Sequence, residues 1–196
     1  MKQYFVDDIE LEDKPLQLEY DLNGEKLIFE TNAGLFSRNE IDEFSETLVN
    51  NIEINKYNKI LDLGCGYGFI GIALSKLVEY QDITFIDITS RACLYTSKNI
   101  INNKVSNYEV IQSDGIQNNT KYDLITLNPP IHAGKEIVYQ LYKNALDHLS
   151  EDGSFYIVLH KKHGAKSTLT YLAEEGYNTE VVYKKKSLYV IKITTK

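Results

Sequence analysis

The sequence predicts an α/β fold with a doubly wound, mostly parallel sheet, an antiparallel last strand and a small β-hairpin in front. Two observations carry this prediction. From Lys59 onward, short apolar runs alternate with stretches of helical periodicity, which is typical of a parallel sheet covered by helices on both faces. Near the C-terminus, two apolar runs are joined only by residues 184–187, and a connection that short cannot make a parallel crossover.

The length and composition are those of one ordinary globular domain. The chain has 196 residues, of which 43% are hydrophobic and 25% are charged. No apolar run reaches the roughly 18 residues of a membrane span, and the first residues lack the apolar core of a signal peptide. We therefore expect a cytoplasmic protein with no membrane contact. Two cysteines, Cys65 and Cys93, are too few for a disulfide framework. Because no Cys or acidic cluster accompanies His160 and His163, no metal is expected there.

Charge is distributed unevenly along the chain, whose net charge is −7. Residues 1–55 hold 14 acidic and 4 basic side chains, whereas residues 161–196 hold 8 lysines and 3 glutamates. A polyanion would therefore dock toward the C-terminal end. Solvated surface explains the same skew equally well.

The N-terminal part predicts a β-hairpin, a loop and a helix. Apolar residues at 16, 18, 20 and 22 alternate with polar ones, and Asn23-Gly24 supplies a tight turn before the alternation restarts at 27 and 29. The loop 31–37 carries an apolar tip. Ser37 is spaced from Glu40 as in a capping box, which predicts a helix with an apolar stripe at 41, 44, 48 and 52. We therefore divide the chain into an N-terminal β-hairpin extension with its loop, residues 1–37, and a main domain, residues 38–196.

The main domain should contain alternating strands and helices. Strands are predicted at 59–63, 83–87, 108–112, 122–127 and 154–159. Helices are predicted at 69–79, 90–102, 135–149 and 166–175, and a closing strand pair at 181–183 and 188–191.

Residues that finish strands form the candidate site, because ligands of open α/β sheets lie beyond the carboxyl ends of the strands. Gly64, Gly66 and Gly68 follow the first strand and allow a sharp turn and a close approach to a ligand. Asp62, which ends that strand, either accepts a hydrogen bond from an ammonium group or holds the turn. Residues 66–71 also satisfy G-x-G-x-x-G, so the glycines alone do not separate a nicotinamide nucleotide from S-adenosylmethionine.

Two further acids end neighbouring strands. Asp87 closes the strand 83–87, where a carboxylate suits a vicinal diol with two hydroxyl donors. Asp114, after the strand 108–112, is placed to accept from an adenine amine. Each acid alone is explained equally well as an ordinary exposed residue at a turn. Both acids in register with the glycine loop favour a nucleoside-containing cofactor.

The most specific signal is Asn128-Pro129-Pro130, which follows the strand 122–127. Two prolines remove two backbone donors and fix the local backbone, so the carbonyls and the Asn128 side chain stay pointed outward. An amide oxygen and a neighbouring carbonyl can then accept both hydrogens of a planar NH2 group, which frees the nitrogen lone pair to attack an electrophilic methyl group. No strong general base is needed, because the proton leaves after the nitrogen has become cationic.

Together these motifs resemble the class I S-adenosylmethionine-dependent methyltransferases, and among them the small-domain family of ribosomal RNA small-subunit methyltransferase C. The loop 32–37 is similar to that family's Gly-Val-Phe-Ser loop, and the segment 128–135 is similar to its post-strand segment. The segment 161–165 and the late lysine-rich strand pair resemble the short, single-domain bacterial members of the family. The resemblance implies a seven-stranded Rossmann-like methyltransferase sheet, S-adenosylmethionine as the cofactor, and ribosomal RNA or the small ribosomal subunit as the partner. The implied reaction is methylation of an exocyclic amine, with guanine N2 of 16S ribosomal RNA as the acceptor.

The resemblance also assigns roles to residues of this chain. The implied catalytic residues are Asn128, Pro129, Pro130 and Ile131. The implied cofactor-binding residues are Asp62, Gly64, Gly66, Gly68, Asp87, Ile88, Asp114, Gly115 and Asn128. The implied acceptor-binding residues are Phe36, Ser37, His132, Lys135 and Lys161.

Two departures from the family pattern leave the acceptor open. Many relatives place an aromatic residue where Ile131 stands, so stacking on the target base would have to come from Phe36 or His132. The longer relatives carry a second, N-terminal copy of the domain, which we expect to be absent here. Protein glutamine and adenine N6 present the same planar NH2 group. Outside this class of enzyme, the chain would be a cofactor-binding module without turnover or a nicotinamide-dependent reductase.

Overall fold

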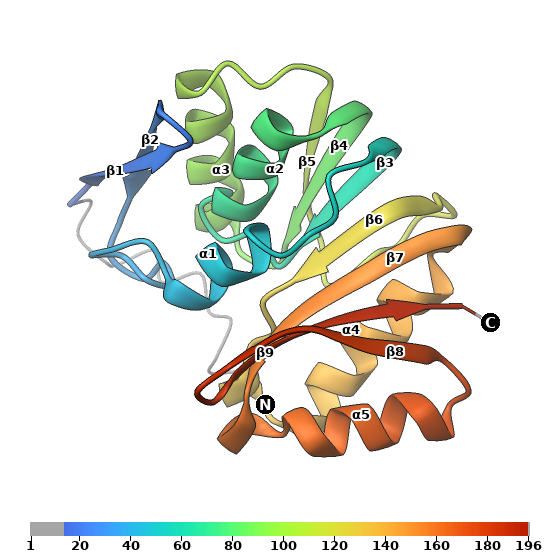
Figure 1. Cartoon of the computed structure of the whole chain (residues 1–196). Coiled ribbons are helices and arrows are strands. Elements are labelled where there is room, and N and C mark those ends of the chain that lie inside the picture. The colour runs from blue at the N-terminus through green and yellow to red at the C-terminus, as the bar shows by residue number, and fades with distance from the viewer. Residues whose placement is uncertain (1–13, 196) are drawn as a thin grey trace.

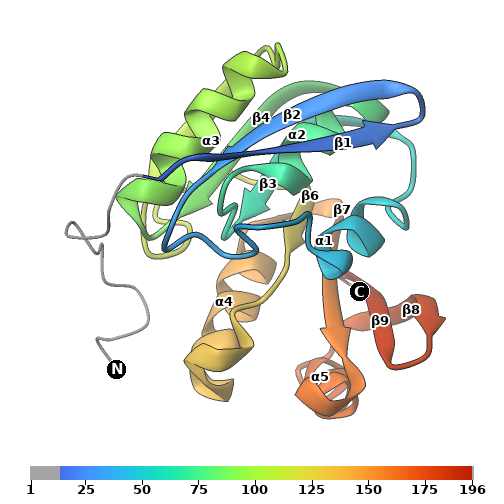
Figure 2. The same ribbon diagram turned by 90° about the vertical axis from the view of Figure 1, so that its left-hand side faces the viewer.

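A computed structural model describes residues 14–195 of the chain, with two sheets and five α-helices in that range (Figures 1 and 2). The first 13 residues of the predicted extension 1–37, and Lys196 at the end of the predicted main domain, lie outside the described residues. None of the helices within residues 14–195 combines the length and the apolar composition that crossing a bilayer requires.

The main sheet has seven strands in the order β5-β4-β3-β6-β7-β9-β8. Their bounds are β3 Lys56–Leu63, β4 Glu79–Asp87, β5 Tyr108–Gln112, β6 Tyr122–Leu127, β7 Leu149–His160, β8 Asn178–Lys185 and β9 Leu188–Thr194. The pairs from β5 to β7 are parallel, and β9 runs antiparallel to both of its neighbours. The predicted mostly parallel sheet with an antiparallel last strand is confirmed. In the strand order, β4 and β5 follow on one side of β3, whereas β6 lies next to β3 on its other side. The topological switch point therefore lies between β3 and β6.

Helices cover both faces of this sheet (Figure 1). Their bounds are α1 Glu43–Val49, α2 Phe69–Leu77, α3 Ser90–Asn102, α4 Lys135–Asp147 and α5 Ala165–Glu174, with short 3₁₀ helices η1 Ile131–Ala133 and η2 Lys161–His163. One apolar core lies on the side of α1, α2 and α3, and a second lies on the side of α4 and α5. Because neighbouring residues of a buried strand face opposite sides, Ile60 belongs to the first core and Leu61 to the second.

The predicted elements exist, but several of their ends are shifted. Helix α2 stops at Leu77 instead of residue 79, because Val78 has an extended backbone and the next strand already starts at Glu79. The strand predicted at 154–159 is the second half of the longer strand β7. Such shifts follow from the weak sequence signal at element ends.

The prediction that Ser37 caps a helix is wrong. Ser37 has a positive φ of 50°, and its hydroxyl donates to the carbonyl of Glu40, whereas a helix cap needs an extended backbone. Helix α1 begins later, and its cap is Asp42, whose carboxylate accepts from the backbone N–H of Ser45 at 2.8 Å. As a result, Ile41 and Ile52 lie outside the helix that was predicted to contain them.

The predicted β-hairpin is confirmed as β1 Leu16–Leu22 and β2 Glu25–Thr31. The free edge of β2 lies beside helix α3 (Figure 2). Two asparagine side chains make hydrogen bonds to this edge. Asn103 accepts from the N–H of Ile28 at 2.9 Å and donates to its carbonyl at 2.7 Å. Asn99 does the same for Glu30, at 2.7 and 2.9 Å. Because Asn99 and Asn103 are one helical turn apart, their amides continue the hydrogen bonding of β2 where a third strand would lie.

Candidate active site

A cavity of about 680 Å³ opens at the carboxyl ends of β3, β4, β5 and β6, at the switch point of the sheet. Its volume falls within the range of about 300–1,000 Å³ that is usual for small-molecule sites. The predicted site residues on its wall are Phe36, Gly64, Gly66, Asp87, Ile88, Asp114, Gly115, Asn128, Pro129, Pro130, Ile131 and His132. We refer to this space as the main cavity.

The loop after β3 bends back over the end of β4. Gly64 and Cys65 both donate their N–H groups to the carbonyl of Ile86, at 2.7 and 3.0 Å. Gly64 and Gly66 have φ values of 69° and 60°, which side chains rarely adopt, so glycine is required for this turn. The N–H of Gly66 donates to one oxygen of Asp87 at 2.9 Å. Asp87 therefore fixes the position of the glycine loop.

Asp87 still has room for a ligand. Its carboxylate accepts from Gly66, from the N–H of Thr89 at 3.0 Å and from the hydroxyl of Thr89 at 3.1 Å. Since a carboxylate offers about four acceptor positions, roughly one is left for a hydroxyl donor of a bound ribose. Burial raises the pKa of Asp87, and these donors act against that effect by stabilising the charged form.

Asp62 and Gly68 lie behind the loop and not on the wall of the main cavity. Asp62 is fully buried and accepts from the N–H of Gly71 at 2.9 Å and from the hydroxyl of Thr126 at 3.3 Å. Burial raises the pKa of Asp62 to about 7, although both hydrogen bonds favour the charged form. Gly68, with a φ of 87°, precedes α2, and a Cβ there would lie only 3.1 Å from Thr96. In this structure both residues contact the loop and helix that shape the cavity.

Asn128 is held in one orientation by two side chains of α1 and its cap. Its amide nitrogen donates to a carboxylate oxygen of Asp42 at 2.8 Å and to the hydroxyl of Ser45 at 3.0 Å. The Ser45 hydroxyl also donates to Asp42, at 2.9 Å. Because an ionised carboxylate only accepts hydrogen bonds, the nitrogen of the Asn128 amide must face Asp42. The amide oxygen is thereby left available, as an acceptor, to a ligand in the main cavity.

The prolines shape the segment that follows. The carbonyl of Pro129 accepts from the N–H of Ile131 at 2.8 Å, and that of Pro130 accepts from Ala133 at 2.9 Å. These bonds turn the chain into η1 and place Ile131 and His132 on the rim of the main cavity.

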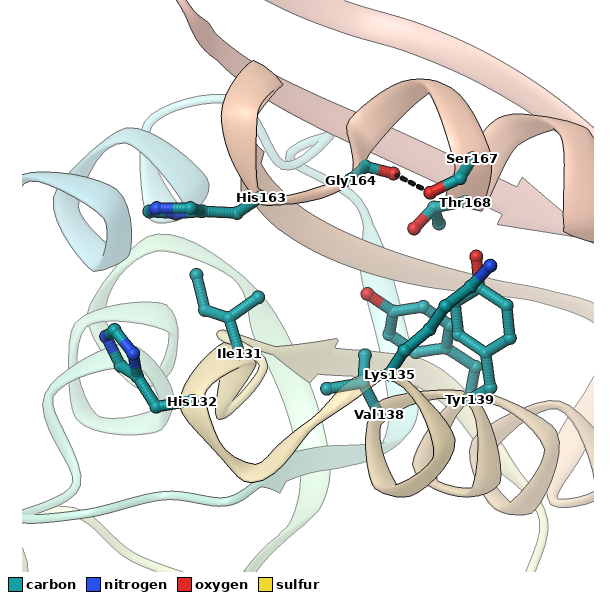
Figure 3. A pocket seen from close by; sticks show the side chains of 10 residues that line it. Ile131, His132, Lys135, Val138, Tyr139, His163, Gly164, Ser167 and Thr168 are labelled. Atoms are coloured by element: carbon teal, nitrogen blue, oxygen red, sulfur yellow. Dashed lines mark hydrogen bonds between the residues drawn. The ribbon is translucent and has the colours of Figure 1, made fainter.

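The predicted acceptor-binding residues do not all gather in one place. Phe36 is 65% exposed at the mouth of the main cavity, and His132 lines it too. Ser37 and Lys161 line neither this cavity nor its neighbour. Lys135 lines a second, smaller cavity next to η1, which Figure 3 shows.

Sequence reasoning missed Asp42 and Ser45. Asp42 lies 86 residues before Asn128, and in the sequence it is one of many acids in residues 1–55. The only local signal is the spacing of Asp42 and Ser45, which is that of a helix cap. The sequence did not assign several further wall residues to the site, namely Phe44, Tyr67, Phe69, Ile137, Leu141 and His163.

Comparison with known proteins shows which family the chain belongs to. The family model of the methyltransferase small domain matches residues 26–192. The Bacillus subtilis (strain 168) protein YbxB is 34% identical over 177 residues, which are 88% of each chain. The ribosomal RNA small subunit methyltransferase C of Mannheimia succiniciproducens is 34% identical over 140 residues, which are 69% of this chain but 41% of that protein. The chain thus spans about two fifths of the length of this longer relative.

Solved structures with the same fold include further methyltransferases. The T. thermophilus 16S rRNA N2 G1207 methyltransferase (RsmC), in complex with AdoMet and guanosine, superposes with a TM-score of 0.81 at 19% identity. The match covers 94% of this chain and 52% of that one. A ribosomal protein L11 methylase from Lactobacillus delbrueckii subsp. bulgaricus gives a TM-score of 0.67 at 19% identity, over 78% and 77% of the two chains.

The family match extends from the second strand of the hairpin to the last strand. The wall of the main cavity carries Asp87, which has about one acceptor position left, and Asp114, and two glycines allow close approach of the backbone. The chain belongs to the methyltransferase small domain family and is a class I S-adenosylmethionine-dependent methyltransferase of the type of ribosomal RNA small-subunit methyltransferase C.

Proposed function

We propose that the protein methylates an exocyclic amine of RNA, with guanine N2 of small-subunit ribosomal RNA as the acceptor. The observation that carries this proposal is the Asn128 amide, which Asp42 and Ser45 orient so that its oxygen can accept from a ligand in the main cavity. Bound S-adenosylmethionine supplies an electrophilic methyl group at this site.

The residues of the chain prepare the acceptor nitrogen. The Asn128 oxygen accepts one hydrogen of the planar NH2 group, which draws the nitrogen lone pair out of conjugation with the base. Asp42 polarises the Asn128 amide from the other side, so positive charge that develops on the acceptor nitrogen is stabilised. The proton leaves after the nitrogen has become cationic, and no strong base is required at the nitrogen.

The predicted roles divide according to where the residues lie. Gly64, Gly66, Asp87, Ile88, Asp114 and Gly115 line the part of the cavity that we assign to the cofactor. Asp62 and Gly68 act from behind by shaping the loop. Phe36 and His132 line the main cavity, and we assign to them stacking on the acceptor base. Many relatives have an aromatic residue for this stacking at the position of Ile131.

Support for RNA as the substrate comes from the relatives. Several similar proteins are named ribosomal RNA small subunit methyltransferase C, and one structural neighbour was solved with AdoMet and guanosine. The Asn128 site alone would also accept a protein glutamine or adenine N6, because each presents a planar NH2 group.

The test uses small-subunit ribosomal RNA and whole subunits from a strain that lacks the gene. The protein with labelled S-adenosylmethionine should transfer label to the RNA, and nucleoside analysis should find N2-methylguanosine. Asn128→Ala should lower turnover by about 100-fold, because an acceptor that acts on the reacting nitrogen is lost. Its affinity for S-adenosylhomocysteine, measured by calorimetry, should stay within a few fold.

The exposed Asn119 provides the control, since Asn119→Ala removes an amide that lines neither cavity and should keep full turnover. Absence of label from RNA and subunits would refute the RNA assignment. Loss of S-adenosylhomocysteine binding in Asn128→Ala would make Asn128 a structural residue.

A further inference from the structure

A second cavity of about 230 Å³ adjoins the main cavity (Figure 3). The two cavities share Ile131, His132 and His163 on their walls, so they are direct neighbours. Its volume is below the roughly 300 Å³ at which whole-ligand sites begin. It therefore suits one part of a larger ligand.

The two cavities differ in charge. Asp42, Asp87 and Asp114 stand on the wall of the main cavity, which suits a cationic cofactor. Among residues 14–195, no carboxylate lines the second cavity. Its charged side chain is Lys135, whose ammonium group lies 5.0 Å from the centre of the Tyr139 ring. The second cavity is thus suited to an anion.

Two helices begin at this cavity without a side-chain cap. Gly134 precedes α4 and Gly164 precedes α5, with φ values of 100° and 93°. The first intrahelical bonds are made by Val138 and Thr168, at 3.2 and 2.8 Å. The N–H groups of residues 135–137 in α4 and of residues 165–167 in α5 therefore have no partner inside their own helix. The start of a helix carries partial positive charge and favours phosphate groups.

A buried hydroxyl group points to a ligand independently of the helices. Tyr142 is fully buried, lines the cavity, and its hydroxyl has no hydrogen-bond partner of acceptable geometry among the described residues, although Thr168 is a near neighbour. The buried hydroxyl of Tyr139 is likewise unpaired within residues 14–195. Burial raises the pKa of Tyr142, so its hydroxyl remains a neutral donor. An unpaired buried hydroxyl is unfavourable, and a bound acceptor would remove that cost.

We propose that the second cavity binds a phosphodiester group of the RNA, the one next to the nucleotide whose amine lies at Asn128. The donors are Lys135, Tyr142, Thr168 and the first turn of α5, and the apolar wall of Ile131 and Val138 accommodates the attached ribose. This inference rests on the proposed function, because it places the acceptor nucleotide in the main cavity. It also gives a physical reason for RNA over protein, since a glutamine side chain brings no phosphate.

The first experiment measures binding of small-subunit ribosomal RNA in the presence of S-adenosylhomocysteine, as a function of salt. Lys135→Ala should weaken binding by about tenfold and lower the slope of log K against log salt by about 1, as expected for one lost phosphate contact. Lys143, also exposed and on α4, lines neither cavity. The control Lys143→Ala should leave both the affinity and the slope close to those of the wild type.

The second experiment removes the buried hydroxyl without changing the ring. Tyr142→Phe should weaken RNA binding by about tenfold, because a hydrogen bond to a charged group is lost, while the melting temperature stays the same or rises. Tyr156 has a buried unpaired hydroxyl in the other core, so Tyr156→Phe is the matched control and should bind RNA normally. If Tyr142→Phe instead melts at a lower temperature and binds RNA like the wild type, the Tyr142 hydroxyl stabilises the fold and does not bind RNA. That result would overturn the proposal.

These outcomes separate the two proposals. If Lys135→Ala and Tyr142→Phe bind RNA like the wild type while labelled methyl still enters RNA, the phosphate site is wrong and the proposed function stands. If no label enters RNA but both variants weaken binding with the expected salt slope, the methylation target is wrong and the phosphate site stands.

Discussion

At the scale of single residues, the Asp42 carboxylate sets the orientation of the Asn128 amide. Asp42 accepts from the Asn128 amide and from two groups of Ser45, so one side chain both caps α1 and fixes the amide. An asparagine amide that rotated by half a turn would present its NH2 group to the acceptor amine, and two donors would then face each other. We infer that Asp42 is a positioning residue for the Asn128 oxygen.

Asp42→Asn tests this role, because asparagine caps helices as well as aspartate does. The variant should keep α1 and cofactor affinity, but it loses the charge that forces the orientation of Asn128. Turnover should fall by about tenfold with little change in KM for RNA. A tenfold fall corresponds to a loss of about 1.4 kcal/mol in transition-state stabilisation. Steady-state kinetics with labelled cofactor measure both constants. Turnover equal to that of the wild type would mean that the charge of Asp42 contributes nothing.

At the scale of elements, the hairpin β1–β2 is held to the domain by α3. Asn99 also donates to the carbonyl of Tyr67, at 2.8 Å, in the glycine loop after β3. The same residue therefore contacts both β2 and the glycine loop. The hairpin also contributes Leu27 and Phe29 to the core beside α2 and α3. Displacement of the hairpin would therefore disturb the glycine loop as well.

Asn103→Ala should destabilise the fold by about 2–3 kcal/mol, because the N–H and the carbonyl of Ile28 both lose their partners in a site where Asn103 is only 6% exposed. Denaturant unfolding measures the loss, and hydrogen exchange should show lost protection at the Ile28 amide. The adjacent Asn102 is exposed and makes only a long contact of 3.4 Å with Glu30, so Asn102→Ala is the control. Unchanged protection at Ile28 in Asn103→Ala would show that the hairpin docks by apolar contacts alone.

The elements also show what could be predicted from sequence. The strands and most helices could be predicted, because buried strands consist of apolar runs and because α3 and α4 have clear helical periodicity. Gly64, Gly66, Asp87, Asp114 and Asn128 could also be predicted as cavity residues, because each ends or closely follows a strand. Asp42, Asn99 and Asn103 could not be, because each role depends on a partner far along the chain, and in the sequence they are ordinary polar residues of a cap or a helix face.

At the scale of the whole molecule, the main cavity joins segments that lie far apart in the sequence, from Gly34 to His163. Its wall includes the loop after the hairpin, α1, the ends of the parallel strands and His163 beyond β7. A ligand that fills it contacts both apolar cores, through Phe69 on one side and Leu127 on the other. Binding should therefore stabilise the fold as a unit.

S-adenosylhomocysteine at about 100 times its Kd should stabilise the native state by about 2.7 kcal/mol, which corresponds to a rise in Tm of about 5–10 °C for a domain of this size. NADH at the same concentration should give no comparable shift, although the glycine loop also fits the dinucleotide pattern. Asp114→Ala removes an exposed acceptor from the cavity wall and should reduce the shift without lowering the Tm of the free protein. Stabilisation by NADH alone would contradict the cofactor assignment, and an undiminished shift in Asp114→Ala would exclude Asp114 from the site.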